Sequence, residues 1–337
     1  MSSLPKLSVI LPTYNECEWL PETLRCLDDA LQRAEWTNAE VIVVNDGSTD
    51  STTTVVEGLN LNCDLRCISQ KNSGRFAARK VGLEAASGTH VLLIDSRVHV
   101  QQDSLVFLAN QIMSHPDRQV WNGDVNLADP SNPYSAFWTC ITRAAWRQYF
   151  KTRTLNSFGD DDFDYFPKGT TFFFAPKQFL LDSCNSFESN FEDASLSNDD
   201  TVLIRPIARR TRIYISPDFI CTYFSRDSRK KFWKHSYHRG TVFVDAYFRA
   251  GSRYLPMFIG LIAFSIALLL LLSKFPVIGL SILAIGILLP GFGFWYVGLS
   301  MVEILGFYRA LPVFVPSYTA GISRGLLFLW SKKLFKK

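Results

Sequence analysis

Apolar runs and amphipathic segments alternate along the first hundred residues of the chain. Three short, mostly apolar runs have the length of buried strands: 7–11, 41–44 and 90–94. Three further segments have the pattern of helices: 18–35, 48–59 and 73–86. In the first of these helices, Leu20, Leu24, Leu27 and Leu31 recur at helical spacing. The alternation predicts an α/β fold built on a parallel sheet with right-handed crossovers.

The pattern is less regular in the middle of the chain. Strands are expected at 119–127, 166–175 and 212–215. Helices are expected at 133–149, 200–208 and 226–249. Two polar segments are expected to be loops, 156–164 and 183–200, and the first of them, which is rich in aspartate, is expected to be mobile.

Two long uncharged segments follow, at 254–273 and 277–300. Each is long enough to cross a bilayer core of ~30 Å. The alternative is a hairpin buried in a soluble core, and it fits less well because core helices seldom lack charge over such lengths. Residues 304–330 are apolar but interrupted, which favours an interfacial or re-entrant segment over a third span; the interrupting residues are Arg309, Pro312, Pro316 and Arg324.

These patterns divide the chain into three parts. Residues 1–225 are expected to form the α/β domain and 226–252 an amphipathic interfacial helix. Residues 253–337 are expected to form a transmembrane hairpin with an interfacial C-terminal segment. Basic residues lie on both sides of the apolar part, and such residues favour the cytoplasmic side of a membrane. We therefore expect an even number of crossings, with both ends inside.

Polar residues follow each of the three N-terminal strands. They occupy 12–16, 45–50 and 95–97, and a further polar segment, 72–75, opens a helix. Open α/β sheets bind ligands at the carboxyl ends of their strands. The placement predicts an enzyme that handles a nucleotide.

Composition further limits the classes of ligand that the protein is expected to bind. The formal net charge is only +4, so nucleic acid is not an expected partner. The seven cysteines include no Cys-x-x-Cys pair, and the five histidines supply no zinc-ligand spacing.

Taken together, several motifs resemble those of the family 2 glycosyltransferases, in the membrane-anchored, non-processive branch. The motifs are the segments 11–16, 44–50, 78–82 and 95–97, in that order along the chain. The resemblance extends over roughly residues 7–240. It implies the GT-A fold, the Rossmann-like fold of nucleotide-diphospho-sugar transferases, followed here by C-terminal transmembrane helices.

The resemblance also implies a donor site. Asp46 would bind the nucleobase, since a carboxylate accepts the imide N–H of uracil. The other expected nucleotide contacts are Pro12, Thr13, Tyr14, Glu16, Asp95 and Ser96. Arg75 and Arg79, at the start of a helix, would bind the diphosphate. Each has a plainer alternative: turn formation for Asp46, packing for Tyr14, and a solvated helix face for the arginines.

The segment 95–97 departs from the family pattern. Relatives carry Asp-x-Asp there, and the second aspartate holds Mg²⁺ or Mn²⁺ against the diphosphate. This chain has Asp95-Ser96-Arg97. Three interpretations follow: Asp95 and His99 still hold a divalent ion, Arg97 itself faces the diphosphate, or the domain is catalytically degenerate. The first is favoured slightly, because a divalent Lewis acid assists departure of the diphosphate.

Two later motifs concern the acceptor. Asp199-Asp200 resembles the Glu-Asp motif of the family, which implies that Asp200 is the general base for the acceptor hydroxyl. Helix capping is the alternative role for either aspartate. Gly169 matches an acceptor-side strand of the family, where its small size leaves room for a sugar.

The segment 230–240 interleaves cations with aromatic residues. Lys234, His238 and Arg239 are expected to contact lipid headgroups or a lipid phosphate. A solvated basic face is the alternative. The Gln-x-x-Arg-Trp motif of processive relatives is absent from the sequence here.

The expected activity is inverting transfer of a sugar, most simply from a UDP-sugar donor. The expected acceptor is membrane-associated, either a polyprenyl phosphate or a lipid-linked glycan, in surface polysaccharide or glycoconjugate synthesis. We expect an integral protein of the plasma (inner) membrane with a cytoplasmic catalytic domain. The alternatives are a catalytically degenerate membrane scaffold and a nucleotidyltransferase; the latter usually has a Gly-rich basic loop after its first strand, and 12–16 is not one.

Overall fold

The computed structural model describes residues 4–186, 199–248 and 255–335. The chain forms two compact units. The first comprises Met1–Ala128 and Gln148–Ser225, and the second comprises Asp129–Arg147 and Arg226–Lys337. Residues 129–147 thus pack with the C-terminal part of the chain, a grouping that the sequence pattern did not predict. The expected three-part division stays a prediction.

The first unit is built on an eight-stranded sheet with the order β3-β2-β1-β4-β9-β6-β10-β8. Its strands are β1 (Leu7–Thr13), β2 (Ala39–Asp46), β3 (Asp64–Gln70), β4 (His90–Ile94), β6 (Trp121–Asn122), β8 (Asn156–Phe158), β9 (Phe172–Pro176) and β10 (Ile213–Ile215). A second, three-stranded sheet has the order β5-β11-β7, with β5 (Val98–Val100), β11 (Ile220–Tyr223) and β7 (Asp124–Leu127).

The large sheet is mixed, and the parallel arrangement expected for the N-terminal strands forms one part of it. β1, β2, β3 and β4 are parallel to one another, as the alternation of strands and helices predicted. β9 runs antiparallel to both of its neighbours, β4 and β6. β1, β2 and β4 end at one edge of the sheet, which we call the carboxyl edge.

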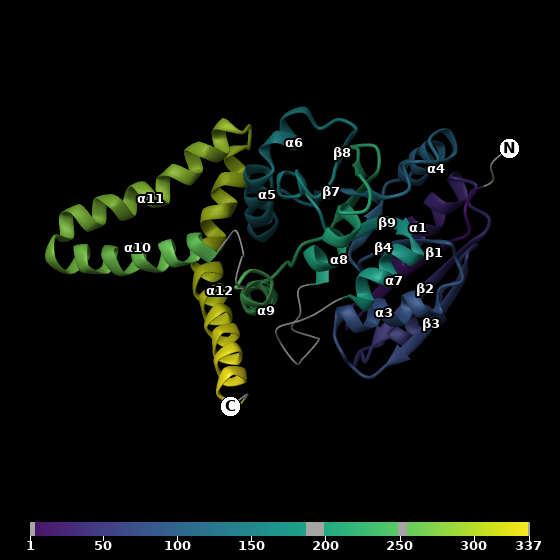
Figure 1. Ribbon diagram of the computed structural model, residues 1–337, viewed down its shortest axis with the longest axis horizontal. Helices are drawn as coiled ribbons and strands as arrows, with labels where there is room; N and C mark the ends of the chain where they lie inside the picture. The colour runs from purple at the N-terminus through teal and green to yellow at the C-terminus, as the bar shows by residue number, and fades with distance from the viewer. Residues whose placement is uncertain (1–3, 187–198, 249–254, 336–337) are drawn as a thin grey trace. The chain divides into compact units, whose positions relative to one another are not determined.

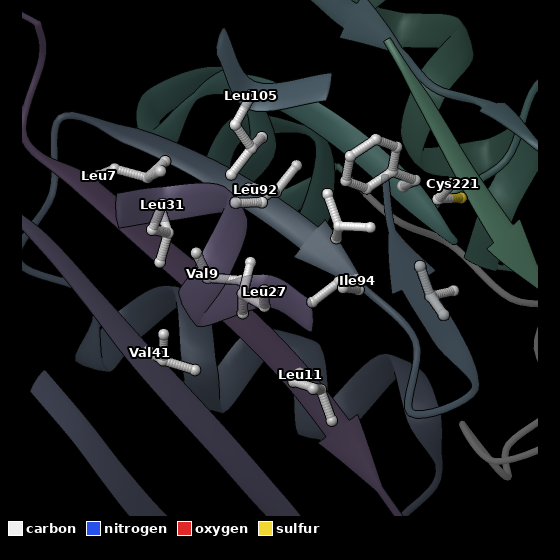
Figure 2. Close-up of a cluster of buried hydrophobic side chains, with 14 of the residues drawn as sticks. Leu7, Val9, Leu11, Leu27, Leu31, Val41, Leu92, Ile94, Leu105 and Cys221 are labelled. Atoms are coloured by element: carbon white, nitrogen blue, oxygen red, sulfur yellow. The ribbon is translucent and has the colours of Figure 1, made fainter. Parts of the chain in front are cut away.

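Helices cover both faces of this sheet (Figure 1). α1 (Leu20–Arg33) and α4 (Ser104–Ser114) pack on one face. Three helices pack on the opposite face: α3 (Arg75–Ala85), α7 (Lys177–Asn185) and α8 (Asp199–Ala208). Side chains of β1 alternate between the two faces, as the pleat requires. Figure 2 shows Leu27 and Leu31 of α1 beside Val9 of β1.

Gly82 explains how close α3 lies to the sheet. A Cβ at this position would overlap Ile10 of β1 and stand 3.2 Å from the Val44 side chain of β2. The helix can lie this low on the sheet only because residue 82 has no side chain.

Several expected elements differ from those observed. The strands β3, β5 and β11 and the helix α7 were not predicted. The helix expected at 133–149 is interrupted at Trp146 into α5 (Pro133–Ala145) and α6 (Arg147–Thr152). The helix expected at 48–59 is only α2 (Thr52–Glu57), with Ser51 at its N-cap position.

The segment 156–164 is also more ordered than expected. It contains β8 and the start of a 3-10 helix, η1 (Phe163–Tyr165). Three of its aspartates form ion pairs: Asp160 and Asp164 pair with Arg205, and Asp162 pairs with Arg212. These pairs tie the segment to α8 and β10.

The second unit is helical, with α5, α9 (Arg229–Tyr247), α10 (Leu255–Lys274), α11 (Pro276–Tyr296) and α12 (Met301–Phe335). Its core is aromatic: Phe137 stacks on Phe307, and Phe232 packs edge-to-face on Phe137. α12 is continuous over 35 residues, although the sequence places Pro312 and Pro316 inside it. Ser300 and Glu303 form a capping box at its start.

α10 and α11 lie side by side as a hairpin (Figure 1). Among the described residues, α11 is the one helix long and apolar enough to cross a membrane, and 17% of its apolar window is buried inside the structure. Its exposed side chains include Leu280, Ile285 and Leu288.

Candidate active site

The loops that follow β1 and β2 are joined to each other at the carboxyl edge. Asn15 adopts a left-handed conformation with φ of 54°. Its side-chain carbonyl accepts a hydrogen bond from the Thr49 backbone N–H at 2.7 Å, and its own N–H donates to the Ser48 hydroxyl at 2.9 Å. Thr13 is buried and Tyr14 is 43% exposed. Tyr14 therefore has a ring face available to a ligand, whereas Thr13 is part of the packed strand end.

Asp46 is buried at the end of β2 and holds the turn that precedes α3. Its Oδ1 accepts hydrogen bonds from Gln70 at 2.7 Å and from the Ser73 N–H at 2.8 Å. Its Oδ2 accepts from the Gly74 N–H at 2.9 Å. The turn-forming role is thus present in the structure. A carboxylate has about four acceptor positions, so a role toward a nucleobase stays a prediction.

Gly47, next to Asp46, has φ of 74°, and a Cβ here would lie 2.6 Å from the Asn72 backbone N. The Asp-Gly pair therefore brings the β2 loop against the turn before α3.

Asp95, directly after β4, forms a buried ion pair with Arg79 of α3. The Arg79 Nη2 lies 2.8 Å from Asp95 Oδ1, and the two side chains are 1% and 15% exposed. The Thr171 hydroxyl donates to the other oxygen, Oδ2, at 3.0 Å. Both oxygens of Asp95 are therefore already hydrogen-bonded. Arg79, which the family resemblance places at the diphosphate, pairs with this carboxylate in the structure, and its contact with a diphosphate stays a prediction.

Arg97, two residues further on, forms a second buried ion pair. Its Nε lies 3.0 and 2.9 Å from the two carboxylate oxygens of Glu16, with the side chains 6% and 12% exposed. Its guanidinium carbon lies 4.7 Å from the centroid of the Trp19 ring, a cation–π contact. Arg97 Nη1 is buried and has no hydrogen-bond partner within the described part of the chain.

Ser96 and Pro12 connect the segment after β4 to the end of β1. The Ser96 hydroxyl donates to the Pro12 carbonyl at 3.0 Å, and the Thr23 hydroxyl of α1 donates to the Ser96 carbonyl at 2.8 Å. Both predicted residues thus serve here to fasten β1, α1 and the segment after β4 together.

The expected metal ligands do not form a recognisable site. Over the described ranges, no group of three or more His, Cys, Asp and Glu side chains could hold a metal ion. His99 lies in β5 with its ring 4.4 Å from that of Phe224, and burial lowers the pKa of its imidazole. Asp95 is committed to Arg79 and Thr171. A divalent cation held by Asp95 and His99 would also have to tolerate the neighbouring Arg97, so these residues do not fit the metal.

The remaining predicted residues are dispersed. Asp199 and Asp200 begin α8, but their side chains lie outside what the structure describes. Arg75 is the exposed first residue of α3. Gly169 precedes β9 rather than lying within it, and its N–H donates to Asn122 at 3.1 Å; open space surrounds its Cα, as an acceptor-side glycine would require.

The predicted membrane-facing residues belong to the second unit. Lys234, His238 and Arg239 are exposed on α9. The Arg239 guanidinium carbon lies 4.5 Å from the centroid of Trp138 on α5. A cation stacked on an indole is the arrangement expected at a headgroup boundary, but a lipid contact stays a prediction.

Sequence reasoning missed three contributors to the site: Trp19, Gln70 and Thr171. Trp19 directly precedes α1, and its ring lies against the Arg97 guanidinium. Gln70 ends β3, a strand whose alternating polar and apolar residues could have been recognised from 64–70. Thr171 carries no sequence signal, because only the antiparallel pairing of β9 with β4 brings it to Asp95.

Comparison with known proteins agrees with this geometry. Residues 8–174 match the model of the family described as Glycosyl transferase family 2. This chain carries a family 2 glycosyltransferase domain. Together with the strand order and the carboxyl-edge loops, the match identifies the first unit as an α/β GT-A-like fold.

Three curated relatives each match about a third of the chain. It is 34% identical over 111 residues to the glycosyltransferase GlyA of Streptococcus pneumoniae serotype 4, covering 33% of this chain and 15% of GlyA. It is 36% identical over 97 residues to the uncharacterized glycosyltransferase YibD of Escherichia coli K12, covering 28% and 27%. It is 37% identical over 112 residues to the poly(ribitol-phosphate) beta-N-acetylglucosaminyltransferase TarS of Staphylococcus aureus Mu50, covering 33% and 19%. The chain thus spans well under half the length of these relatives.

Among solved structures, the chain is similar to the mannosyltransferase PcManGT from Pyrobaculum calidifontis, which was solved in complex with GDP-Man and Mn²⁺. The alignment covers 100% of this chain and 89% of PcManGT, with 17% sequence identity and a TM-score of 0.48. At this distance the likeness supports no conclusion about ligands.

Proposed function

We propose that the chain is an inverting glycosyltransferase that moves a sugar from a nucleotide donor, most simply a UDP-sugar, to a membrane-associated acceptor. The observation that carries the proposal is the meeting of two ion pairs, Arg79–Asp95 and Arg97–Glu16, at the carboxyl edge of a family 2 glycosyltransferase domain. The family match favours glycosyl over nucleotidyl transfer.

In the proposed reaction, the acceptor oxygen attacks the anomeric carbon of the donor sugar. The bond from that carbon to the diphosphate oxygen breaks, and the nucleoside diphosphate leaves with the bonding electron pair. Asp200 takes the proton of an acceptor hydroxyl, and a single displacement inverts the configuration. The resemblance of Asp199-Asp200, at the start of α8, to the Glu-Asp motif of the family supports this role.

The second unit supports the choice of a membrane-associated acceptor. α11 is apolar over 21 residues and mostly exposed. Arg239 of α9 lies over the ring of Trp138, and Arg324 of α12 lies over the ring of Tyr237 of α9. A polyprenyl phosphate or a lipid-linked glycan would satisfy both features. A phosphate acceptor is already ionised and needs little help from a base, so the role of Asp200 depends on which of the two is used.

The test is release of nucleoside diphosphate by the full-length protein in detergent. UDP-glucose, UDP-N-acetylglucosamine and GDP-mannose would each be supplied with either a polyprenyl phosphate or a lipid-linked glycan. With a hydroxyl acceptor, Asp200→Asn should lower kcat by about 10²- to 10⁴-fold. With a phosphate acceptor the loss should stay below about tenfold.

Asp161→Asn is the matched control, because Asp161 is an exposed aspartate of the first unit, and it should leave kcat unchanged. Nucleotide binding without release from any donor would contradict the proposal and favour a degenerate scaffold.

A further inference from the structure

A donor diphosphate at the carboxyl edge would bring about two negative charges into a largely buried place. Such charges need a compensating cation, either an ion or an arginine. Helix α3 and the segment after β4 supply arginines there, among them Arg79 and Arg97, which are both buried. The inference below rests on the proposed function, because it concerns how the same donor is held.

Arg79 is already committed to the protein. It is almost completely buried, and its Nη2 binds Asp95 at 2.8 Å. Asp95 is in turn fixed by Thr171 through its second oxygen. Removing Arg79 would leave a buried carboxylate without its counter-charge, so this pair acts as part of the scaffold.

Arg97 is held in a different way. Glu16 engages it through Nε, and Trp19 supports one face of the guanidinium. These two contacts fix the orientation of a flexible side chain and leave Nη1 buried without a partner in the described part of the chain. A buried donor of this kind is costly in a protein interior and is satisfied when a ligand oxygen binds.

A divalent cation fits these residues poorly. Both oxygens of Asp95 accept hydrogen bonds from the protein. The side chain at residue 97 is itself a cation, and it neutralises Glu16, another carboxylate of this edge. A divalent ion placed here would be repelled by the charge of Arg97.

We propose that Arg97 binds the donor diphosphate directly, through Nη1, and that donor binding by this chain needs no divalent cation. Glu16 and Trp19 are positioning residues that hold the guanidinium ready for the ligand. Arginine is suited to this task because its planar donors match phosphate oxygens.

The first experiment measures binding of UDP, GDP, CDP and dTDP to the full-length protein in detergent, by calorimetry, in EDTA and then in Mn²⁺. We expect at least one nucleoside diphosphate to bind with a Kd that changes less than about threefold between the two conditions. Binding that is lost in EDTA would overturn the inference while leaving the proposed function intact. Absence of binding by all four in both conditions would overturn both.

The second experiment separates a ligand contact from a structural clamp. Arg97→Ala should weaken binding of the diphosphate by about 10- to 100-fold, the size expected for a charged hydrogen bond. It should change binding of the matching nucleoside monophosphate much less. Glu16→Gln keeps an oxygen that can accept a hydrogen bond from Arg97 Nε and so preserves the positioning, but it removes a negative charge near the ligand. This variant should therefore leave diphosphate binding equal or tighter. If Arg97 only clamped the Glu16 loop, both substitutions would weaken binding alike, and the inference would fail.

Arg33→Ala is the matched control for the loss of an arginine. Arg33 also binds a carboxylate, Asp103, through Nε and Nη2, but at the opposite end of α1 and in an exposed pair. It should not change any Kd. Arg97→Lys should recover part of the affinity, since it keeps the charge but loses the planar donors.

A converse variant, Arg97→Asp, restores the Asp-x-Asp pattern of the family. Its binding of the diphosphate should be weak in EDTA and should improve at least tenfold in Mn²⁺. Binding by this variant that matches the original chain in EDTA would show that residue 97 does not face the diphosphate.

Discussion

At the residue scale, buried carboxylates of the first unit act as acceptors that fasten loops to strands. Asp46 collects three donors from the turn before α3. Glu40 of β2 accepts hydrogen bonds from the Ser8 hydroxyl at 2.6 Å and from the Ser87 N–H at 2.7 Å, and it pairs with Arg66 at 3.0 Å. Hydrogen bonds from several donors favour the ionised form of a carboxylate. The same hydrogen bonds hold the donating loop in one position against the strand.

Glu40 gives a pH-dependent prediction. Burial raises its pKa, but the hydrogen bonds from Ser8 and Ser87 and the charge of Arg66 outweigh it and lower the pKa to about 2. An unfolded glutamate titrates at about 4.3. The ionised form therefore stabilises the fold above about pH 4.3, and this contribution is lost as the pH falls toward 2.

Glu40→Gln should lower the free energy of unfolding by about 1–3 kcal/mol at pH 7. The difference in apparent Tm between the variant and the original chain should shrink as the pH falls from about 4.3 to 2. Thermal unfolding of the full-length protein across this range measures it, with the exposed Glu84→Gln as control. A difference that is constant with pH would contradict the assigned pKa direction.

At the scale of elements, glycines decide how closely helices approach their neighbours. In the second unit, Gly240 of α9 faces the backbone carbonyl of Tyr318 in α12, and Gly321 of α12 faces that of Tyr237 in α9. The Thr241 hydroxyl donates to the Gly321 carbonyl at 3.1 Å across the same contact. Backbones this close gain dispersion contacts that any side chain would prevent.

Gly321→Ala should therefore destabilise the α9–α12 contact by about 1–3 kcal/mol, the usual cost of overpacking. Gly286→Ala on α11 is the matched control, because a Cβ there meets nothing within 4 Å and alanine is the better helix former. Apparent Tm and resistance to limited proteolysis in detergent measure the effect. Equal stability of the two variants would show that α9 and α12 are not in close contact in solution.

At the scale of the whole molecule, the exposed apolar hairpin supports membrane association. α11 is 21 residues long, which at 1.5 Å per residue spans about 31 Å, the thickness of a bilayer core. Leu280, Ile285 and Leu288 are each more than half exposed. An exposed apolar surface of this extent is unfavourable in water, which supports the proposed membrane association.

Ile285→Arg tests this at the middle of α11. A charge at the centre of a membrane helix costs about 2.5–3.5 kcal/mol, so the variant should be extracted from membranes by carbonate more readily than the original chain. Phe275→Arg, at the start of the hairpin turn, is the matched control, because a long side chain there can reach the interface. Equal extraction of both variants and the original chain would argue against insertion of α11.

The sequence by itself determined the elements whose signal is local. Continuous apolar runs gave β1, β2 and β4, helical periodicity gave α1 and α3, and long uncharged segments gave α10 and α11, because each such signal lies within one segment of chain. The polar residues after those strands could be assigned to one edge for the same reason, since parallel strands with short crossovers end together. The family resemblance, which the match over residues 8–174 bears out, also rests on local motifs.

Only the tertiary structure decided which partners these residues have. The sequence pattern assigns Arg79 and Arg97 to the same edge of the sheet and does not distinguish their roles. In the structure, Arg79 pairs with Asp95, and Arg97 contacts Glu16 and Trp19. Thr171 reaches Asp95 through an antiparallel strand that no local pattern predicts. The bonded pairs in the site are separated by between 16 and 81 positions in the sequence. Packing of the whole domain brings such residues together, so no local sequence pattern reports which of them will pair.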